Sequence, residues 1–262
     1  MKKIKRQDEI LAAITEKGSI AVSSLISRFP TSEATIRRDL AEMEEQNRII
    51  RTHGSVSTTE IVSGGLHPNF AKRLKSNNLE KQAIAAEAAN LINPGDTIYI
   101  SSGTTPHYLV SYIRNVPNLT VITNGLNVAN SLLNIPNIEC ILIGGLLRKD
   151  EMAFIGHIAE KLTEELRADK IFISSDGIDF EKGLTNSYLP ETLMNRAALK
   201  MSPKLIMMAD HDKFQHIKTA FWAPVNLITT LITDSGTNEE ILKPYRNLGI
   251  NVTIVTPEDQ SL

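Results

Sequence analysis

Apolar positions in the first 55 residues recur at helical spacing and predict three short helices. The first helix is expected over residues 4–17, where Ile10 and Ile14 share one face and Gly18 ends the helix. The second is expected over 22–29, because Pro30 forces the residue before it out of the helical region. A third apolar repeat begins soon after Pro30.

The third predicted helix reads SEATIRRDLAEMEEQ. Ser32 is placed to cap its first turn, since a serine hydroxyl accepts from a free backbone N–H there. A buried face is formed by Ile36, Leu40 and Met43. The opposite face carries Ala34, Arg37, Arg38 and Ala41. Two arginines flanked by small residues therefore face outward.

The stretch RIIRTHGSV (48–56) follows the third helix and is typical of a β-wing. Three helices and a wing predict a winged helix-turn-helix, in which the third helix enters the major groove and its arginines meet phosphates or guanine edges. The alternative is that Arg37 and Arg38 are solvated surface charges. The three-helix pattern around them favours DNA binding.

From Leu79 onward, helical patterns alternate with short runs rich in β-forming residues. Seven strand candidates separated by helix-sized segments predict an α/β domain with a mostly parallel, Rossmann-like sheet. The candidates are 97–101, 119–124, 138–144, 170–174, 204–210, 227–234 and 252–256. We therefore predict a DNA-binding domain over 1–57, a linker over 58–78 that is rich in glycine and hydroxyl residues, and a sensing domain over 79–262.

Polar residues gather where the predicted parallel strands end, which is where open sheets bind ligands. The loop SSGTT (101–105) leads into a helix and presents backbone N–H groups to an anion, and phosphate is the expected ligand. Lys213 could balance the charge of the phosphate, and sugar hydroxyls could bond to Asn124, Asp176 and Asp179. The alternative is that Ser102 and Thr104 only cap a helix.

Composition narrows the class of protein further. The 262 residues carry a net charge of −2, with ten Lys and Arg against eight Asp and Glu in the first 57 residues, an excess too small to decide anything. There is no run of ~18 apolar residues and no export signal, so we expect a cytoplasmic protein without membrane contact. Cys140 lies in the apolar run IECILIG and is expected in the core.

Other kinds of site are poorly supported. The chain has no G-x-x-x-x-G-K-[ST], G-x-G-x-x-G or G-x-S-x-G motif. His211 and His216 stand five apart without a nearby cysteine, which disfavours a metal site. Trp222 and the Met207–Met208 pair are expected in the core. We expect neither a metal nor a cofactor.

The N-terminal stretch resembles the helix-turn-helix of the DeoR family of bacterial transcription regulators. The resemblance rests on TIRRDL at 35–40 and on RTHGS at 51–55, where Ser55 replaces the second glycine of the family's R-x-H-G-G. It also departs at Pro30-Thr31, where the family has an apolar residue and a serine.

The resemblance continues through the sensor domain and so covers nearly the whole chain. It implies a fold like that of ribose-5-phosphate isomerase type A and a response to phosphorylated sugars or related metabolites. Ser101 stands where the family has aspartate. The residues that it implies for the effector are Ser101, Ser102, Gly103, Thr104, Thr105, Thr123, Asn124, Gly144, Gly145, Asp176, Gly177, Asp179 and Lys213.

An isomerase is the alternative from a different class. Asp176, Asp179 and Lys213, with Glu191 as a base, stand at places comparable to those of the isomerases. The sequence around Glu191 does not reproduce their glycine-rich stretch, and a DNA-binding module is hard to explain on such an enzyme. A pure scaffold is a third class, which would bind neither DNA nor a sugar phosphate.

We therefore predict a regulator without catalysis, most simply a repressor of a carbohydrate-utilisation operon. Its expected partners are double-stranded operator DNA, a phosphorylated sugar and further copies of itself, as a dimer or tetramer. The expected DNA contacts are Ser32, Thr35, Arg37, Arg38, Arg51 and His53.

Overall fold

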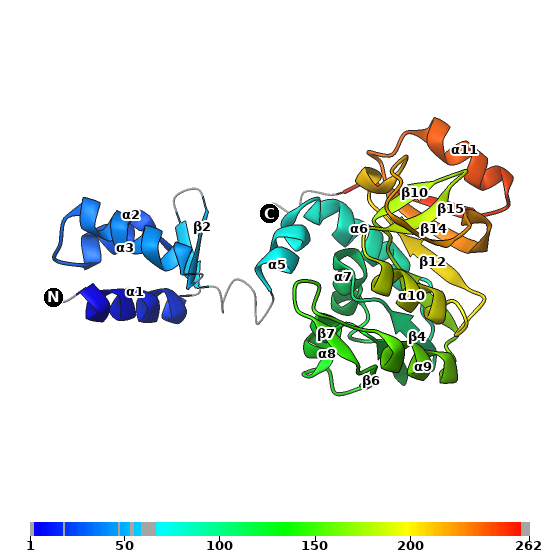
Figure 1. The fold of residues 1–262 in the computed structure, drawn as a ribbon, viewed down its shortest axis with the longest axis horizontal. Coiled ribbons are helices and arrows are strands. Elements are labelled where there is room, and N and C mark those ends of the chain that lie inside the picture. Colours follow the sequence, from blue (N-terminus) through cyan, green and yellow to red (C-terminus); the bar gives the residue numbers. More distant parts are fainter. Residues whose placement is uncertain (1–2, 18, 47, 53–54, 59–66, 258–262) are drawn as a thin grey trace. The chain divides into compact units, whose positions relative to one another are not determined.

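The computed structural model describes residues 3–17, 19–46, 48–52, 55–58 and 67–257. The chain divides into two compact units, residues 1–71 and 72–262. We call the first unit the head and the second the body, and each is described by itself (Figure 1).

The head is a three-helix unit with a small antiparallel sheet of order β1-β3-β2. Strands β2 and β3 form the predicted wing, so the winged helix-turn-helix is confirmed. The elements are α1 (Lys3–Lys17), β1 (Ser19–Ala21), α2 (Val22–Arg28), α3 (Glu33–Glu45), β2 (Ile49–Thr52) and β3 (Ser55–Thr58).

Helix α3 begins and packs as its sequence predicts. The Ser32 side chain caps it by accepting from the Thr35 backbone N–H. Ile36, Leu40 and Met43 are fully buried in the head's core. Helical spacing therefore leaves the arginine-bearing face of α3 outside that core.

Part of the stretch that we predicted as a linker is helical. Helix α5 (Pro68–Lys75) lies within it, and residues 59–66 fall outside the described part of the chain. The helix has a physical cause that the loop-like composition concealed. Proline suits a first helical position, and Phe70 and Leu74 are spaced for one face.

The body is built on a seven-stranded sheet in which each pair of neighbouring strands is parallel. All seven predicted strands are present. Their order is β15 (Asn251–Val255), β14 (Ile228–Asp234), β12 (Leu205–Met208), β9 (Lys170–Ile173), β4 (Thr97–Ile100), β5 (Leu119–Thr123) and β6 (Ile138–Leu142).

Helices cover both faces of this sheet (Figure 1). In β4, Ile98 and Ile100 enter one core cluster and Tyr99 enters the other, as strand alternation requires. The cluster around Ile98 includes α6 (Asn78–Ala89), α7 (Thr104–Tyr112) and α8 (Leu126–Leu132). The cluster around Tyr99 includes α9 (His157–Glu165), α10 (Leu189–Ala198) and α11 (Glu239–Asn247). The body is thus a three-layer α/β/α domain.

The strand order reverses between β4 and β9. Along the chain, β4, β5 and β6 build the sheet outward in one direction, and β9, β12, β14 and β15 build it in the other. The carboxyl ends of β4 and β9 therefore flank a topological switch point, where sheets of this kind bind ligands.

Smaller elements complete the body and were not predicted. They are the hairpin β7 (Leu146–Arg148) with β8 (Ala153–Ile155), the antiparallel sheet of β10 (Gly177–Asp179), β11 (Gly183–Asn186) and β13 (Ala220–Ala223), and the 3₁₀ helices η1 (His211–Lys213) and η2 (Val225–Leu227). None of the described helices has the length and apolar character needed to cross a bilayer.

Residue Cys140 corrects one expectation. Its strand β6 is the last strand of the sheet, with a neighbour on one side only, and Cys140 is exposed. The prediction of a core cysteine is therefore wrong, because an apolar run does not reveal whether its strand is central or at the edge. Trp222, Met207 and Met208 are buried, as predicted.

Candidate DNA-binding face and effector pocket

The outward face of α3 presents Arg37 and Arg38, which are both exposed. Arg37 pairs with Glu33 one turn earlier, with 2.7 Å between its Nη2 and Glu33 Oε1. An exposed pair of this kind contributes about 0.3–0.5 kcal/mol, so phosphate can displace Glu33 readily. The face is therefore free to meet the negatively charged DNA backbone.

The other predicted DNA contacts differ in how they are placed. Ser32 and Thr35 bond to each other at 2.8 Å between their hydroxyl oxygens, at the start of α3. Arg51 belongs to strand β2, but its side chain and the whole of His53 lie outside what the structure describes.

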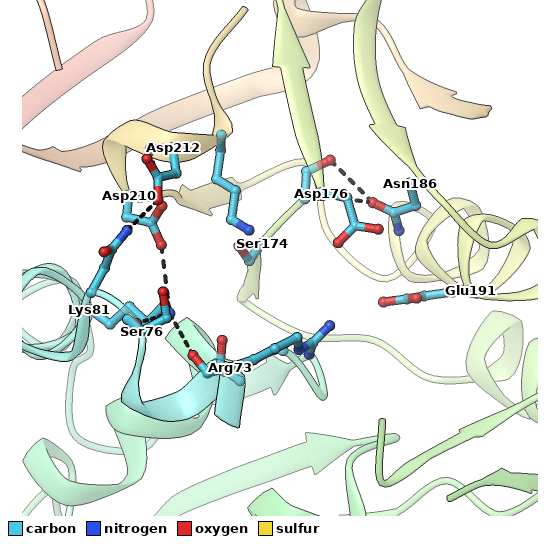
Figure 2. Close-up of a pocket in the computed structure, with 14 residues that line it drawn as sticks. Arg73, Ser76, Lys81, Ser174, Asp176, Asn186, Glu191, Asp210 and Asp212 are labelled. Atoms are coloured by element: carbon cyan, nitrogen blue, oxygen red, sulfur yellow. Dashed lines mark hydrogen bonds and ion pairs between the residues drawn. The ribbon is translucent and has the colours of Figure 1, made fainter. Parts of the chain in front are cut away.

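A polar pocket lies at the switch point of the body (Figure 2). Three strand ends supply residues to it: Gly103 and Thr104 after β4, Ser174, Ser175 and Asp176 after β9, and Asp210, Asp212 and Lys213 after β12. Arg73 and Ser76 at the end of α5, Asn77 and Lys81 at the start of α6, Asn186 of β11 and Glu191 of α10 complete the lining. Of the predicted effector residues, Gly103, Thr104, Asp176 and Lys213 are brought together here.

One part of the pocket suits an anion. Helix α7 begins after Gly103, and no side chain in the described part of the chain caps its first turn, so the alternative role of Ser102 and Thr104 as caps is not observed. The Lys213 side chain has no hydrogen-bond or ion-pair partner among the described residues. Arg73 is paired with Glu151 through Nη1 and Nη2, but its Nε is buried without a partner in that part of the chain. Free N–H groups at a helix start beside such cations form an anion site.

Lys81 is a buried lysine with a different task. Its Nζ donates to the backbone oxygens of Arg73, at 2.8 Å, and Ser76, and lies 3.9 Å from Asp210 Oδ2. Burial lowers the pKa of Lys81, although Asp210 opposes the shift. Lys81 therefore holds the end of α5 in place beside the pocket.

Carboxyl and amide groups line another part of the pocket. Glu191 Oε2 accepts from Arg148 Nη1 at 3.1 Å, and Arg148 stacks 4.3 Å from the centre of the Tyr188 ring. Burial, reinforced by Asp176 and Glu151, raises the pKa of Glu191 to about 7. The Glu191 carboxyl can therefore donate or accept a hydrogen bond near neutral pH.

A neighbouring hollow extends the pocket. It adds Lys218, among others, and the residues that it shares with the pocket are Arg73, Asp176, Glu191, Asp212 and Lys213. The two hollows therefore adjoin each other.

Other predicted effector residues have structural tasks instead of lining the pocket. Thr123 donates to the Ile100 carbonyl at 2.7 Å, and Asn124 is held between the Tyr99 hydroxyl and the Phe154 carbonyl. The Asp179 carboxylate accepts from two backbone N–H groups of the turn that follows it. Ser101, Ser102 and Thr105 are buried and, like Gly144, lie outside the lining.

The glycines Gly145 and Gly177 serve close packing. A Cβ at Gly177 would lie 2.3 Å from the His216 carbonyl oxygen, and one at Gly145 would lie 2.8 Å from that of Ile155. Neither glycine lines the pocket.

Several lining residues escaped sequence reasoning. Arg73, Ser76 and Asn77 lie in the stretch that we predicted as a linker, where no pattern marked them. Asn186 sits in a short strand that we did not predict. Asp210 and Asp212 follow strand β12, and polar residues were predicted at the ends of the parallel strands.

Comparison with known proteins agrees with both units. Residues 6–62 match the model of a DeoR-like helix-turn-helix domain, and residues 76–235 match that of a DeoR C terminal sensor domain. The chain belongs to the DeoR family. The resemblance seen in the sequence is thereby confirmed.

Similar proteins in this family are regulators. The chain is 34% identical to the HTH-type transcriptional regulator GolR of Listeria innocua, covering 95% of this chain and 97% of GolR. It is 31% identical to the glycerol-3-phosphate regulon repressor of Escherichia coli K12, covering 90% and 92%. The chain is therefore a DNA-binding transcriptional regulator and not an enzyme, which leaves the isomerase alternative unsupported.

The fold also has a distant likeness among solved structures. Ribose 5-phosphate isomerase from Plasmodium falciparum is 17% identical, covers 53% of each chain and gives a TM-score of 0.38. That likeness is too weak to bear on function.

Proposed function

We propose that this DeoR-family regulator is a cytoplasmic repressor of a carbohydrate-utilisation operon, and that a phosphorylated sugar bound in the body controls its affinity for operator DNA. The observation that carries the effector class is the pocket itself. It joins the start of α7 and a lysine that has no partner among the described residues to a group of carboxyl and amide side chains.

The anion-binding part suits a phosphate ester. Thr104 begins α7, and its backbone N–H, aided by the helix dipole, can donate to a phosphate oxygen. Lys213 supplies the positive charge that such a group needs. Arg73 pairs with Glu151 through Nη1 and Nη2, and its Nε, which has no partner in the described part of the chain, can add one more hydrogen bond.

The remaining lining suits the polyol part of a sugar. Asp176 and Glu191 offer acceptor oxygens, and Asn186 offers N–H groups. Relatives point to the same chemistry, since one is named for the regulon of glycerol-3-phosphate.

Operator binding in turn suggests a homo-oligomer. One winged head makes too few phosphate contacts for tight binding at physiological salt, and a dimer or tetramer would read repeated half-sites. The effector would act by binding one arrangement of the oligomer better than another.

A melting-temperature screen tests the effector class. The purified chain is heated with a panel of aldose and ketose phosphates, with the unphosphorylated sugars and with inorganic phosphate. We expect at least one ester to raise the melting temperature more than its parent sugar does, because a ligand that binds the folded state stabilises it. A panel in which no ester does so refutes the sugar-phosphate effector.

A further inference from the structure

Asn186 has an unused donor inside the pocket. The residue is 1% exposed and lines the cavity, and its Nδ2 has no partner in the described part of the chain. Buried amide nitrogens are nearly always hydrogen-bonded, so an orphan that lines a ligand pocket points to a missing partner.

The orientation of this amide follows from its other contact. Asn186 Oδ1 lies 3.1 Å from the backbone nitrogen of Asp176, which can only donate. The oxygen must therefore face Asp176, and Nδ2 must point the other way. Figure 2 shows this nitrogen turned toward the side of the pocket where Glu191 lies.

The amide is also held in place. Asp176 Oδ2 accepts from the Ser187 backbone N–H at 2.9 Å, so the chain segments after β9 and β11 bind each other in both directions. The Trp222 indole donates to Ser175 at 3.2 Å and braces the same loop. A donor fixed in this way before the ligand arrives can discriminate between ligands.

We propose that Asn186 determines specificity in this pocket: its Nδ2 donates to a hydroxyl oxygen of the phosphorylated sugar, and the same hydroxyl donates to the Glu191 carboxyl. The inference rests on the proposed function, since it names how that effector is read. A hydroxyl fits because it both accepts and donates, and Glu191 presents an acceptor oxygen whether or not it is protonated.

Two parts of the pocket recognise two parts of the ligand. Lys213 and the start of α7 recognise the phosphate that all members of the ligand class share. Asn186 and Glu191 recognise one hydroxyl, which distinguishes one sugar phosphate from another. Sites built to bond a hydroxyl reject analogues that lack it, because the buried donor is then left unpaired.

Titration calorimetry on the full-length chain tests the proposal. The probes are the tightest-binding sugar phosphate of the panel and its monodeoxy analogues. The variant is Asn186→Asp, which keeps an oxygen for the Asp176 N–H but replaces the NH₂ group with an acceptor. Asn137→Asp is the matched control, because Asn137 is exposed, lies outside the lining and gains the same charge.

We expect Asn186→Asp to weaken binding of the parent sugar phosphate about tenfold or more, and Asn137→Asp to leave it within twofold. One monodeoxy analogue should bind the wild type more weakly than the parent compound does, by a similar factor. For that analogue, the loss of affinity caused by Asn186→Asp should be at least fivefold smaller than for the parent compound. The analogue already lacks the hydroxyl that Asn186 contacts.

Two results would overturn this inference and leave the proposed effector class standing. One is equal binding of the parent compound, within twofold, by the wild type and a folded Asn186→Asp. The other is a wild type that binds all monodeoxy analogues as tightly as the parent, which decides the matter even when the variant does not fold. A wild type that binds no panel member refutes the proposed effector class as well. Binding that changes neither with Asn186→Asp nor with removal of a hydroxyl refutes this inference alone.

Discussion

The Nε of Arg6 lies 2.5 Å from Asp39 Oδ2, which joins α1 to α3 inside the head. The Asp39 side chain is 3% exposed and the Arg6 side chain 11%. The motif TIRRDL thus has two tasks. Its arginines face outward, and its aspartate anchors the helix that carries them.

Asp39→Ala should unfold the head more easily. It removes the carboxylate that pairs with Arg6 between α1 and α3, and removing one member of an ion pair leaves the other charge uncompensated. We expect faster hydrogen exchange of the α3 amides in the full-length chain, with the body unchanged. Glu33→Ala, which removes an exposed carboxylate from the same helix, is the control. Exchange in Asp39→Ala no faster than in this control would contradict the structural role.

Replacing both Arg37 and Arg38 with alanine should weaken operator binding without changing the stability of the head. Two lost phosphate contacts would lower the slope of log affinity against log salt by about 2. The measurement is fluorescence anisotropy on a DNA fragment that the wild type selects from a random library. The control pair Arg114→Ala and Lys161→Ala removes two exposed charges from the body. An unchanged slope in the α3 variant would mean that this face does not bind DNA.

Lys213→Ala should weaken sugar-phosphate binding about 10- to 100-fold, because a hydrogen bond to a charged group contributes about 1.5–3 kcal/mol. Binding of inorganic phosphate should weaken in parallel, since the lost contact is to the phosphate. Calorimetry measures both, with Lys161→Ala as the charge-matched control. Loss of sugar-phosphate binding with phosphate binding intact would place the anion elsewhere.

Glu191 should make the body less stable as the pH rises from about 4.5 to 7. Burial, with Asp176 and Glu151, raises the pKa of Glu191 to about 7, against the opposing effect of Arg148 and Arg73. In that window the folded chain keeps a proton that the unfolded chain has released, so raising the pH favours unfolding.

Glu191→Gln removes this titrating carboxyl. The melting temperature of the variant should therefore fall less than that of the wild type between pH 4.5 and 7. Burial lowers the pKa of His107 to about 4, which acts in the opposite direction below pH 6.5. His107 is present in both proteins, and its effect cancels in the difference between them. Parallel melting profiles for the two proteins would show that Glu191 titrates at an ordinary pH.

Local sequence patterns predicted most of the fold. The cap at Ser32 and the apolar repeat of α3 are local signals, and the seven strands were marked by short β-rich runs. Exposure of β6 was missed, because an edge strand and a central strand of a parallel sheet can have the same apolar sequence.

The candidate site was predictable only where a residue follows its own strand. Thr104, Asp176 and Lys213 lie at strand ends, and the rule for parallel sheets places them together. Arg73 and Asn186 reach the pocket through α5 and β11, whose packing depends on distant parts of the chain. Asn124 also follows a strand, yet local bonds to Tyr99 and Phe154 occupy it.

The most direct test of control by a sugar phosphate is titration of the ester found in the melting screen into the complex of the full-length chain with operator DNA, followed by anisotropy. We predict that the ester changes operator affinity about tenfold or more in the wild type, in line with typical coupling between sites. Lys213→Ala should bind the operator as the wild type does, yet need about 10- to 100-fold more ester for the same change. Operator affinity that stays constant while the ester saturates the body would contradict the account.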